Sequence, residues 1–180
     1  MLTLENLCLR RWSQWRIKAV LTKNKGFTLI ELMIVMQIIS IIAAIAIPNM
    51  IRFRIQTNQA AAVGNLAAVS RAQAMFTGAE RGYATSFADL RDTPISKGQV
   101  AYLDIDFTAG TVSGYDYALE PAGEPVPTNS GVEGNSDFHA RANPANPGSF
   151  GSGIYYYYVD ATGVIRYSKE GPADETSNVL

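Results

Sequence analysis

One continuous apolar stretch, Phe27 to Ile47, dominates the hydrophobic pattern of the sequence. Its twenty-one residues carry a single charge, on Glu31. At about 1.5 Å per residue they would form a helix of roughly 31 Å, enough to cross the hydrocarbon core of a bilayer. We therefore predict a membrane-spanning helix over 27–47. A plain anchor, a secretory signal cut after Ala44-Ile45-Ala46 and a buried core helix are the competing interpretations.

Beyond Pro48 the pattern stays helical and becomes amphipathic. Apolar residues recur at spacings of three, four or seven, with one polar interruption at Gln73: Ile51, Ile55, Ala62, Leu66, Val69 and Phe76. Because Pro48 lies between two helical patterns, we expect it to kink the helix rather than end it. Gly78 and Gly82 mark the expected end, so one helix is predicted over about 27–77.

The second half of the chain predicts a small antiparallel sheet packed on the helical stripe, an α+β domain. Period-two alternation indicates strands, the last two forming a hairpin, at residues 101–107, 113–120, 154–160 and 164–168. Residues 121–153 are rich in proline and glycine and show no periodicity, so we predict a surface loop there. The segment from Gly171 is expected to be a polar tail.

Charge is distributed unevenly along the chain. Residues 1–26 hold six basic side chains and one acidic one, whereas the remainder holds nine basic and fifteen acidic. A basic flank before an apolar span predicts that residues 1–26 begin in the cytoplasm and the body lies outside. This pattern is typical of a membrane-oriented protein, and no direct nucleic-acid binding is predicted. The one cysteine, Cys8, lies in the basic segment and cannot form a disulfide within one chain.

We find no catalytic constellation in the sequence. The one histidine, His139, lies in the predicted loop, where a solvated side chain is expected. Asp104 and Asp106 share a predicted strand face that could hold calcium, although a solvated face explains them equally well. The run Tyr155 to Tyr158 is interpreted as core packing on one strand face and a sticky surface on the other. The sequence therefore predicts no enzyme activity, cofactor or metal site.

Glu31 argues against an ordinary anchor or signal sequence. A carboxylate inside an apolar span costs at least a few kcal/mol. If the chain were cut after Gly26, Phe27 would carry a new α-ammonium one helical turn from Glu31. The carboxylate could then pair with that ammonium, or with a neighbour's, inside a helix bundle.

The apolar run opens with Lys25-Gly26-Phe27-Thr28-Leu29-Ile30-Glu31-Leu32 and closes at Pro48. A basic flank, a Gly-Phe junction, a placed glutamate and a terminal proline together resemble the processing motif of type IV prepilins. The resemblance implies a peptidase that cuts after Gly26 and N-methylates Phe27. It also implies that Glu31 and Pro48 serve filament assembly. The close resemblance covers residues 23–50; Gln37 and Ser40 depart from its usual small apolar residues.

The resemblance implies three segments: a cleaved basic leader over 1–26, a transmembrane and filament-core helix over 27–47, and an extracytoplasmic head over 48–180. The chain would be a structural subunit of a type IV pilus, for adhesion, motility or DNA uptake. Its partners would be further copies in a helical filament, the prepilin peptidase and N-methyltransferase, the inner-membrane assembly machinery and, before assembly, membrane lipid. It would start as a single-pass inner-membrane precursor and end in a surface pilus or a periplasmic pseudopilus.

Two other functions compete with the pilus subunit. A type II secretion pseudopilin shares the processing motif, although such proteins usually carry a C-terminal calcium loop that is not evident here. A monomeric envelope protein, anchored or secreted, would use its outer domain to bind a ligand.

Overall fold

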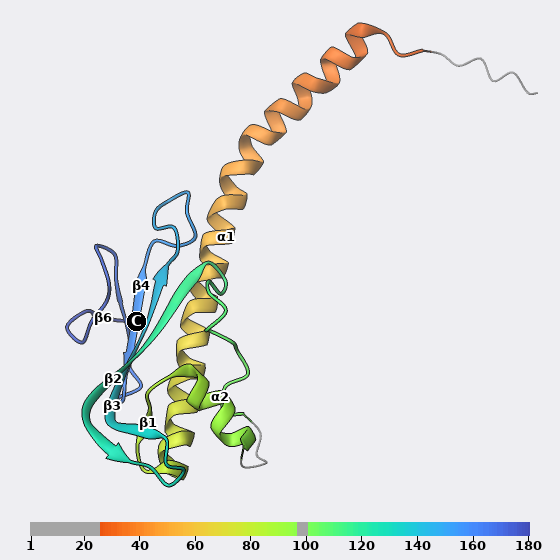
Figure 1. Cartoon of the computed structure of the whole chain (residues 1–180). Coiled ribbons are helices and arrows are strands. Elements are labelled where there is room, and N and C mark those ends of the chain that lie inside the picture. The colour runs from red at the N-terminus through yellow and green to blue at the C-terminus, as the bar shows by residue number, and fades with distance from the viewer. Residues whose placement is uncertain (1–25, 97–100) are drawn as a thin grey trace, which may run out of the picture. The chain divides into compact units, whose positions relative to one another are not determined.

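A computed structural model describes residues 26–96 and 101–180, with the side chains of 93–96 left aside (Figure 1). The predicted leader lies outside the described residues, apart from Gly26. The chain divides into two compact units, residues 1–42 and 43–180. Each unit is described by itself.

The helix α1 extends from Leu29 to Glu80, a total of 52 residues. From Leu29 to Ile42, within the first unit, every side chain is exposed. Among the described residues, α1 is the one helix long and apolar enough to cross a membrane, and its most apolar window is not buried at all. An apolar helix without protein cover needs lipid or other helices around it.

In the second unit α1 continues through Pro48 to the end of its amphipathic half. The predicted continuity beyond Pro48 is confirmed, and the helix ends three residues later than predicted. Gly78 does not end it. The chain leaves the helix at Arg81, whose φ of 72° places a non-glycine residue in the left-handed region.

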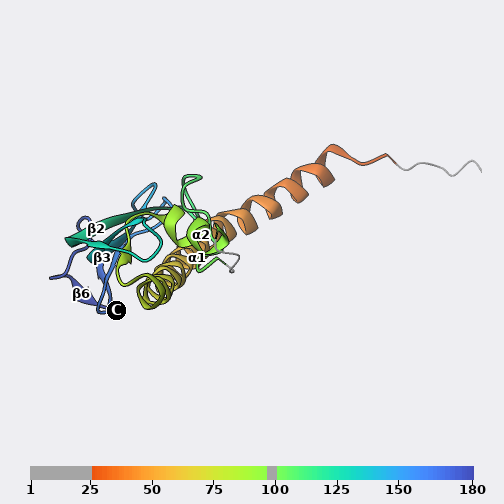
Figure 2. The ribbon, with the colours of Figure 1, turned by 60° about the horizontal axis from the view of Figure 1, so that its bottom comes forward.

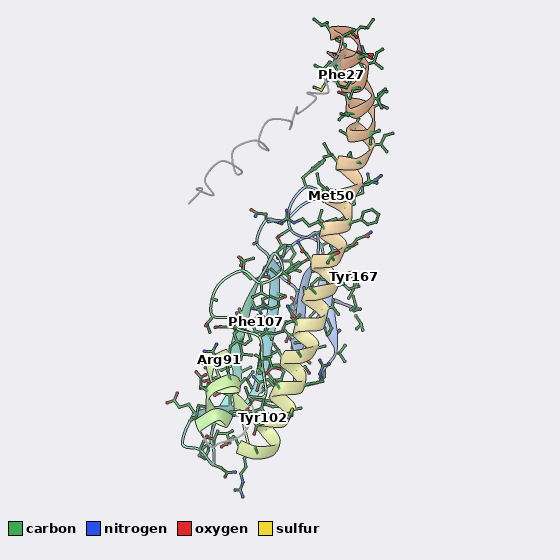
Figure 3. The ribbon with its side chains drawn as sticks, turned by 90° about the vertical axis from the view of Figure 1, so that its right-hand side faces the viewer. Phe27, Met50, Arg91, Tyr102, Phe107 and Tyr167 are labelled. Atoms are coloured by element: carbon green, nitrogen blue, oxygen red, sulfur yellow. The ribbon has the colours of Figure 1, made fainter. Side chains whose placement is uncertain are left out.

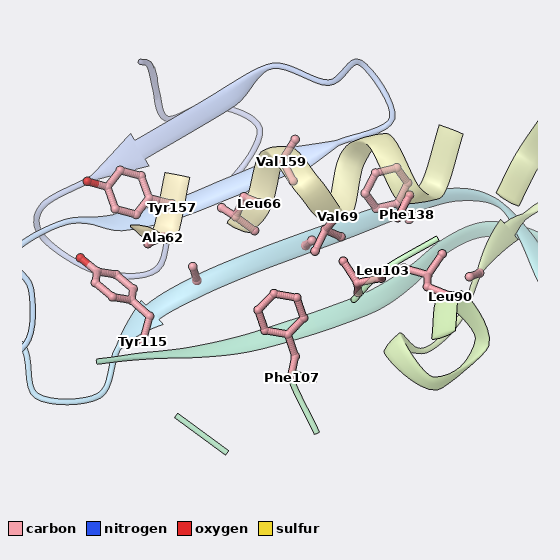
Figure 4. Close-up of a cluster of buried hydrophobic side chains, with 14 of the residues drawn as sticks. Ala62, Leu66, Val69, Leu90, Leu103, Phe107, Tyr115, Phe138, Tyr157 and Val159 are labelled. Carbon is pink, nitrogen blue, oxygen red and sulfur yellow. The ribbon is translucent and has the colours of Figure 1, made fainter. Parts of the chain in front are cut away.

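The predicted apolar stripe forms the helical side of the core (Figure 4). Leu66, Val69 and Phe76 are fully buried there. The polar interruption, Gln73, is buried as well, because its side-chain amide hydrogen-bonds both backbone groups of Ala84. The stripe is therefore continuous, with one polar residue satisfied by a backbone segment.

An antiparallel sheet lies along the head part of α1 (Figures 1 and 2). Its strands are β1 (Tyr83–Ala84), β2 (Tyr115–Pro127), β3 (Glu133–Pro144), β4 (Tyr156–Asp160), β5 (Ile165–Ser168) and β6 (Asn178–Val179). The order is β1-β3-β4-β5-β6, and β2 pairs with β3. Phe138, Tyr157 and Val159 point into the core, so alternate positions of β3 and β4 face the helix.

The prediction of a structureless loop over 121–153 is wrong. Residues 121–127 complete β2 and residues 133–144 form β3, the best-connected strand of the sheet. Prolines are tolerated in β2 because it pairs with β3 alone among the described strands, so its outer edge needs no N–H donors. A register shift between Ala122 and Pro125 absorbs the remaining irregularity.

Two further expectations need correction. Residues 101–107 form no strand, yet Leu103 and Phe107 are buried in the core. Their alternation reflects a loop that packs two side chains inward. The tail from Gly171 is also structured: Ala173 is buried, and β6 adds to the edge of β5. The predicted hairpin over 154–168 is confirmed by the pairing of β4 with β5.

A short helix that the sequence analysis did not predict, α2 (Phe87–Ser96), follows β1. Ser86 and Asp89 cap its start reciprocally: the Asp89 amide donates to the Ser86 hydroxyl, and the Ser86 amide donates to the Asp89 carboxylate. Arg91 of α2 then contacts Asp106 at 2.7 Å, which attaches the irregular 101–107 segment to the helix.

Candidate processing and assembly site

The Gly26-Phe27 junction lies in non-helical backbone immediately before α1. Phe27 is 86% exposed (Figure 3). A Cβ added at Gly26 would meet no atom of the described residues within 4 Å. Packing within that part of the chain therefore does not require glycine at position 26.

Glu31 caps the start of α1. Both the backbone N–H and the hydroxyl of Thr28 donate to one Glu31 carboxylate oxygen, each at 2.8 Å. The Glu31 N–H donates in return to the Thr28 hydroxyl at 3.3 Å. This reciprocal arrangement is a capping box, which satisfies N–H groups that have no partner within the helix.

The capping box stabilises the Glu31 charge without an ammonium partner. The carboxylate is already stabilised by hydrogen bonds and by the positive end of the helix dipole in the uncut chain. Cleavage after Gly26 would place the new α-ammonium of Phe27 next to Thr28, directly beside this box. The sequence analysis missed the cap, although the spacing Thr28-x-x-Glu31 is its sequence signature.

The polar residues farther along the apolar run are accommodated within the helix. The Ser40 hydroxyl donates to the Met36 carbonyl at 2.7 Å, which lets it sit in an apolar environment without an unpaired donor. Pro48 is exposed. It follows Glu31 by seventeen residues in the sequence and belongs to the second unit, whereas Glu31 belongs to the first.

Two of the three candidate metal or catalytic side chains, His139 and Asp106, make contacts within the fold. His139 lies on β3 rather than in a loop, in register with Glu120 on one side and Asp160 on the other. Its ring packs 5.4 Å from that of Tyr158. Asp106 accepts hydrogen bonds from Thr108 and then from Arg91, which lower the pKa of its carboxyl to about 2.

Asp104 and Asp106 share no strand face, since residues 101–107 are irregular. Within the described parts of the chain, no three His, Cys, Asp or Glu side chains gather as a metal site would require.

The tyrosine run alternates as predicted. Tyr157 belongs to the core facing α1, and burial raises the pKa of its phenol to about 12. Tyr158 lies on the other face yet is only 2% exposed, with the Arg141 guanidinium 5.9 Å from its ring centre. The expected sticky outer surface is therefore largely covered at Tyr158.

Comparisons with known proteins match the N-terminal part of the chain. Residues 21–47 match the family described as the prokaryotic N-terminal methylation motif. The chain is 52% identical over 61 residues, 34% of its length, to the type IV major pilin protein PilA of Myxococcus xanthus. It is 48% identical over 63 residues, 35% of its length, to the type IV narrow pilus major component PilA5 of Thermus thermophilus.

The matched segments span 28% and 54% of the lengths of these two curated relatives. No solved structure matches the chain significantly. The comparisons therefore show a prepilin methylation motif and homologous type IV major pilins. The description of the head domain depends on its structure alone.

Proposed function

We propose that this chain is the precursor of a structural subunit of a type IV pilus. A prepilin peptidase cuts it after Gly26 and methylates Phe27, and the mature chain polymerises through the apolar half of α1. One observation supports this most: an exposed, non-helical Gly-Phe junction stands directly before a capped glutamate and a fully exposed apolar helix. The subunit starts as a single-pass inner-membrane protein and ends in a surface filament.

Assembly follows from the exposed side chains of α1. Leu29, Ile30 and Ile41 are 77%, 65% and 65% exposed. In the precursor, lipid covers such side chains; in a filament, the apolar helices of other copies replace the lipid. Glu31 then sets the register, because the capped carboxylate, once moved out of water, is stabilised further where a cation of another copy meets it.

Processing is the first test. We expect mature protein from native cells to begin with N-methyl-phenylalanine at position 27, as measured by mass spectrometry. Gly26→Val should leave uncleaved precursor, because a peptidase must approach the backbone closely at this residue. Since a Cβ at Gly26 would meet no described residue within 4 Å, the variant should keep the fold of the head. A mature N-terminus at Ile47 would contradict the proposal.

The role of Glu31 needs a test that separates its alignment of neighbouring subunits in the filament from its capping of α1. Glu31→Val removes the charge and the two cap bonds that its carboxylate accepts. The control Thr28→Val removes the two cap bonds of the Thr28 hydroxyl and keeps the charge. Losing one partner of a buried ion pair costs roughly 3–5 kcal/mol for each added subunit. Losing a cap costs about 1 kcal/mol.

We therefore expect sheared filaments to be nearly absent with Glu31→Val and largely retained with Thr28→Val, at equal processing. Equal filament yields from Glu31→Val and wild-type cells would refute the register mechanism. A deletion strain separates the competing system: loss of surface filaments supports a pilus, and loss of protein secretion alone would indicate a pseudopilin.

A further inference from the structure

The connection between β3 and β4, residues 145–155, begins with a hydrogen-bonded loop over 145–153 that holds an exposed phenylalanine. Ser152 donates its backbone N–H to the Asn146 carbonyl at 2.7 Å, and its hydroxyl accepts from the Asn146 N–H at 3.0 Å. A Cβ at Gly151 would lie 1.9 Å from the Asn146 carbonyl oxygen, so only glycine allows this closure. The loop tip presents Phe150 with 84% of its surface exposed. Within the head, no packing role accounts for this side chain.

This loop, which we name the Phe150 loop, lies against the first turns of α1 after the apolar run. The Asn58 side chain donates to the Ser152 carbonyl at 2.9 Å, which ties the loop to the helix. A groove of about 380 Å³ separates the two, and its lining includes Arg52, Gln59 and Ser149. Figure 1 shows the β3–β4 connection rising beside α1.

The Phe150 loop therefore reaches the level of a membrane surface if α1 spans the bilayer up to Ile47. Arg52 follows Ile47 by five residues, which is about 8 Å along the helix. The headgroup layer occupies roughly 5–8 Å on each side of the hydrocarbon core. Arg52 falls within or at the edge of that layer, and Ser149 of the Phe150 loop lines the same groove as Arg52.

The same surface is basic and apolar. Arg52 and Arg54 are exposed, and neither forms an ion pair with a residue that the structure describes. The sequence has no Asp or Glu from position 43 to 79, nor from 138 to 159. Met50 and Phe53 are 75% and 67% exposed on these turns; Figure 3 shows Met50 projecting from the helix.

The groove itself offers hydrogen-bond donors. The Gln59 side-chain nitrogen is buried and has no hydrogen-bond partner within the described chain. The Arg52 guanidinium lines the same groove. Of these two, only the Arg52 guanidinium lies at the depth of the headgroups, and beside an apolar wall it suits a phospholipid phosphate.

We propose that this end of the head, formed by residues 48–59 of α1 and the Phe150 loop, docks on the phospholipid surface of the membrane before assembly. Phe150 enters the interfacial layer, and Arg52 binds a lipid phosphate. The inference rests on the membrane-anchored precursor of the proposed function. A second copy fits this surface less well, because two such surfaces face to face would bring four arginines together without a carboxylate.

Depth-dependent quenching tests the docking. The full-length chain, with Trp12→Phe and Trp15→Phe, is placed in vesicles of phosphatidylglycerol and phosphatidylcholine whose acyl chains carry bromine at a shallow or a deep position. Single tryptophans are introduced by Phe150→Trp, by Ile38→Trp inside the apolar run, and by Met75→Trp. Met75 is a matched control because it is 56% exposed on the same helix, beyond the predicted interface.

We expect tryptophan 150 to be quenched at least twofold more strongly by shallow than by deep bromines. Position 38 should be quenched by deep bromines, and position 75 by neither. Arg52→Gln combined with Arg54→Gln should reduce quenching at position 150 about twofold in anionic vesicles. The reduction should be smaller in phosphatidylcholine alone, whose phosphate is accompanied by the cationic choline.

Three results would overturn the inference. If position 38 is quenched but position 150 is no more quenched than position 75, docking is refuted. The anchored precursor is unaffected by that result. A blue-shifted but unquenched tryptophan 150 would mean that a second copy covers the loop. An unquenched position 38 would remove the membrane anchor itself, and with it both this inference and the precursor of the proposed function.

Discussion

Replacing Gln73 with leucine would remove two hydrogen bonds from the centre of the head while keeping nearly the same side-chain volume. The Gln73 side-chain nitrogen donates to the Ala84 carbonyl at 2.9 Å, and its oxygen accepts from the Ala84 N–H at 2.8 Å. Both residues are fully buried. The amide thus makes the pair of bonds that another strand would make along this edge of β1.

The magnitude follows from what Gln73→Leu leaves behind. The N–H and the carbonyl of Ala84 lose partners in a site without water, at about 1–3 kcal/mol for each group. Burial of the leucine side chain stabilises the folded state by roughly 1–2 kcal/mol. We expect the free energy of unfolding to fall by about 2–4 kcal/mol, which lowers Tm by roughly 6–15 °C for a domain of this size.

Urea and thermal unfolding of the full chain in detergent micelles measure this change, followed by near-ultraviolet circular dichroism of the head tyrosines. Gln59→Leu is the matched control: it lies on the same helix, but its side-chain nitrogen has no hydrogen-bond partner in the described chain. It should change the free energy of unfolding by less than about 1 kcal/mol. Equal stabilities of the two variants would refute the role assigned to Gln73.

Three further predictions concern the head. Gly153→Ala should lower the free energy of unfolding by about 2–4 kcal/mol in urea titration, because its Cβ would lie 2.1 Å from the buried Tyr115 hydroxyl. The control Gly78→Ala, with open space around it, should raise the free energy of unfolding by up to about 1 kcal/mol. Arg81→Gly should raise Tm by a few degrees, since it relieves a positive φ; an unchanged Tm would contradict this. Burial raises the pKa of Tyr157 and of Tyr158 to about 12. Because unfolded tyrosines ionise near pH 10, stability should be lost as pH rises from about 10 to 12, and phenolate absorbance should appear together with unfolding.

The sequence alone determined the features that depend on neighbouring residues. The apolar run, the amphipathic half of α1 and the hairpin of β4 and β5 were predicted because side-chain periodicity is a local property. The Gly26-Phe27 junction and its separation from Glu31 follow directly from the order of residues in the sequence. Even the missed capping box was local, since Thr28 and Glu31 are separated by one helical turn.

Only the tertiary structure decided where the proline-rich half of the chain goes. Pro121, Pro125 and Pro127 remove N–H donors that a central strand would need, so the sequence read as a loop. In the fold these prolines lie on β2, whose outer edge has no partner among the described strands, and the missing donors cost nothing there.

The same reason accounts for the other differences. The alternation of residues 101–107 is satisfied by packing Leu103 and Phe107 against the core, without any ladder of backbone hydrogen bonds. The polar tail gains β6 because β5 leaves an edge free to accept it. Whether a backbone group needs a partner, and where it finds one, depends on which edge and which face the completed fold presents to it.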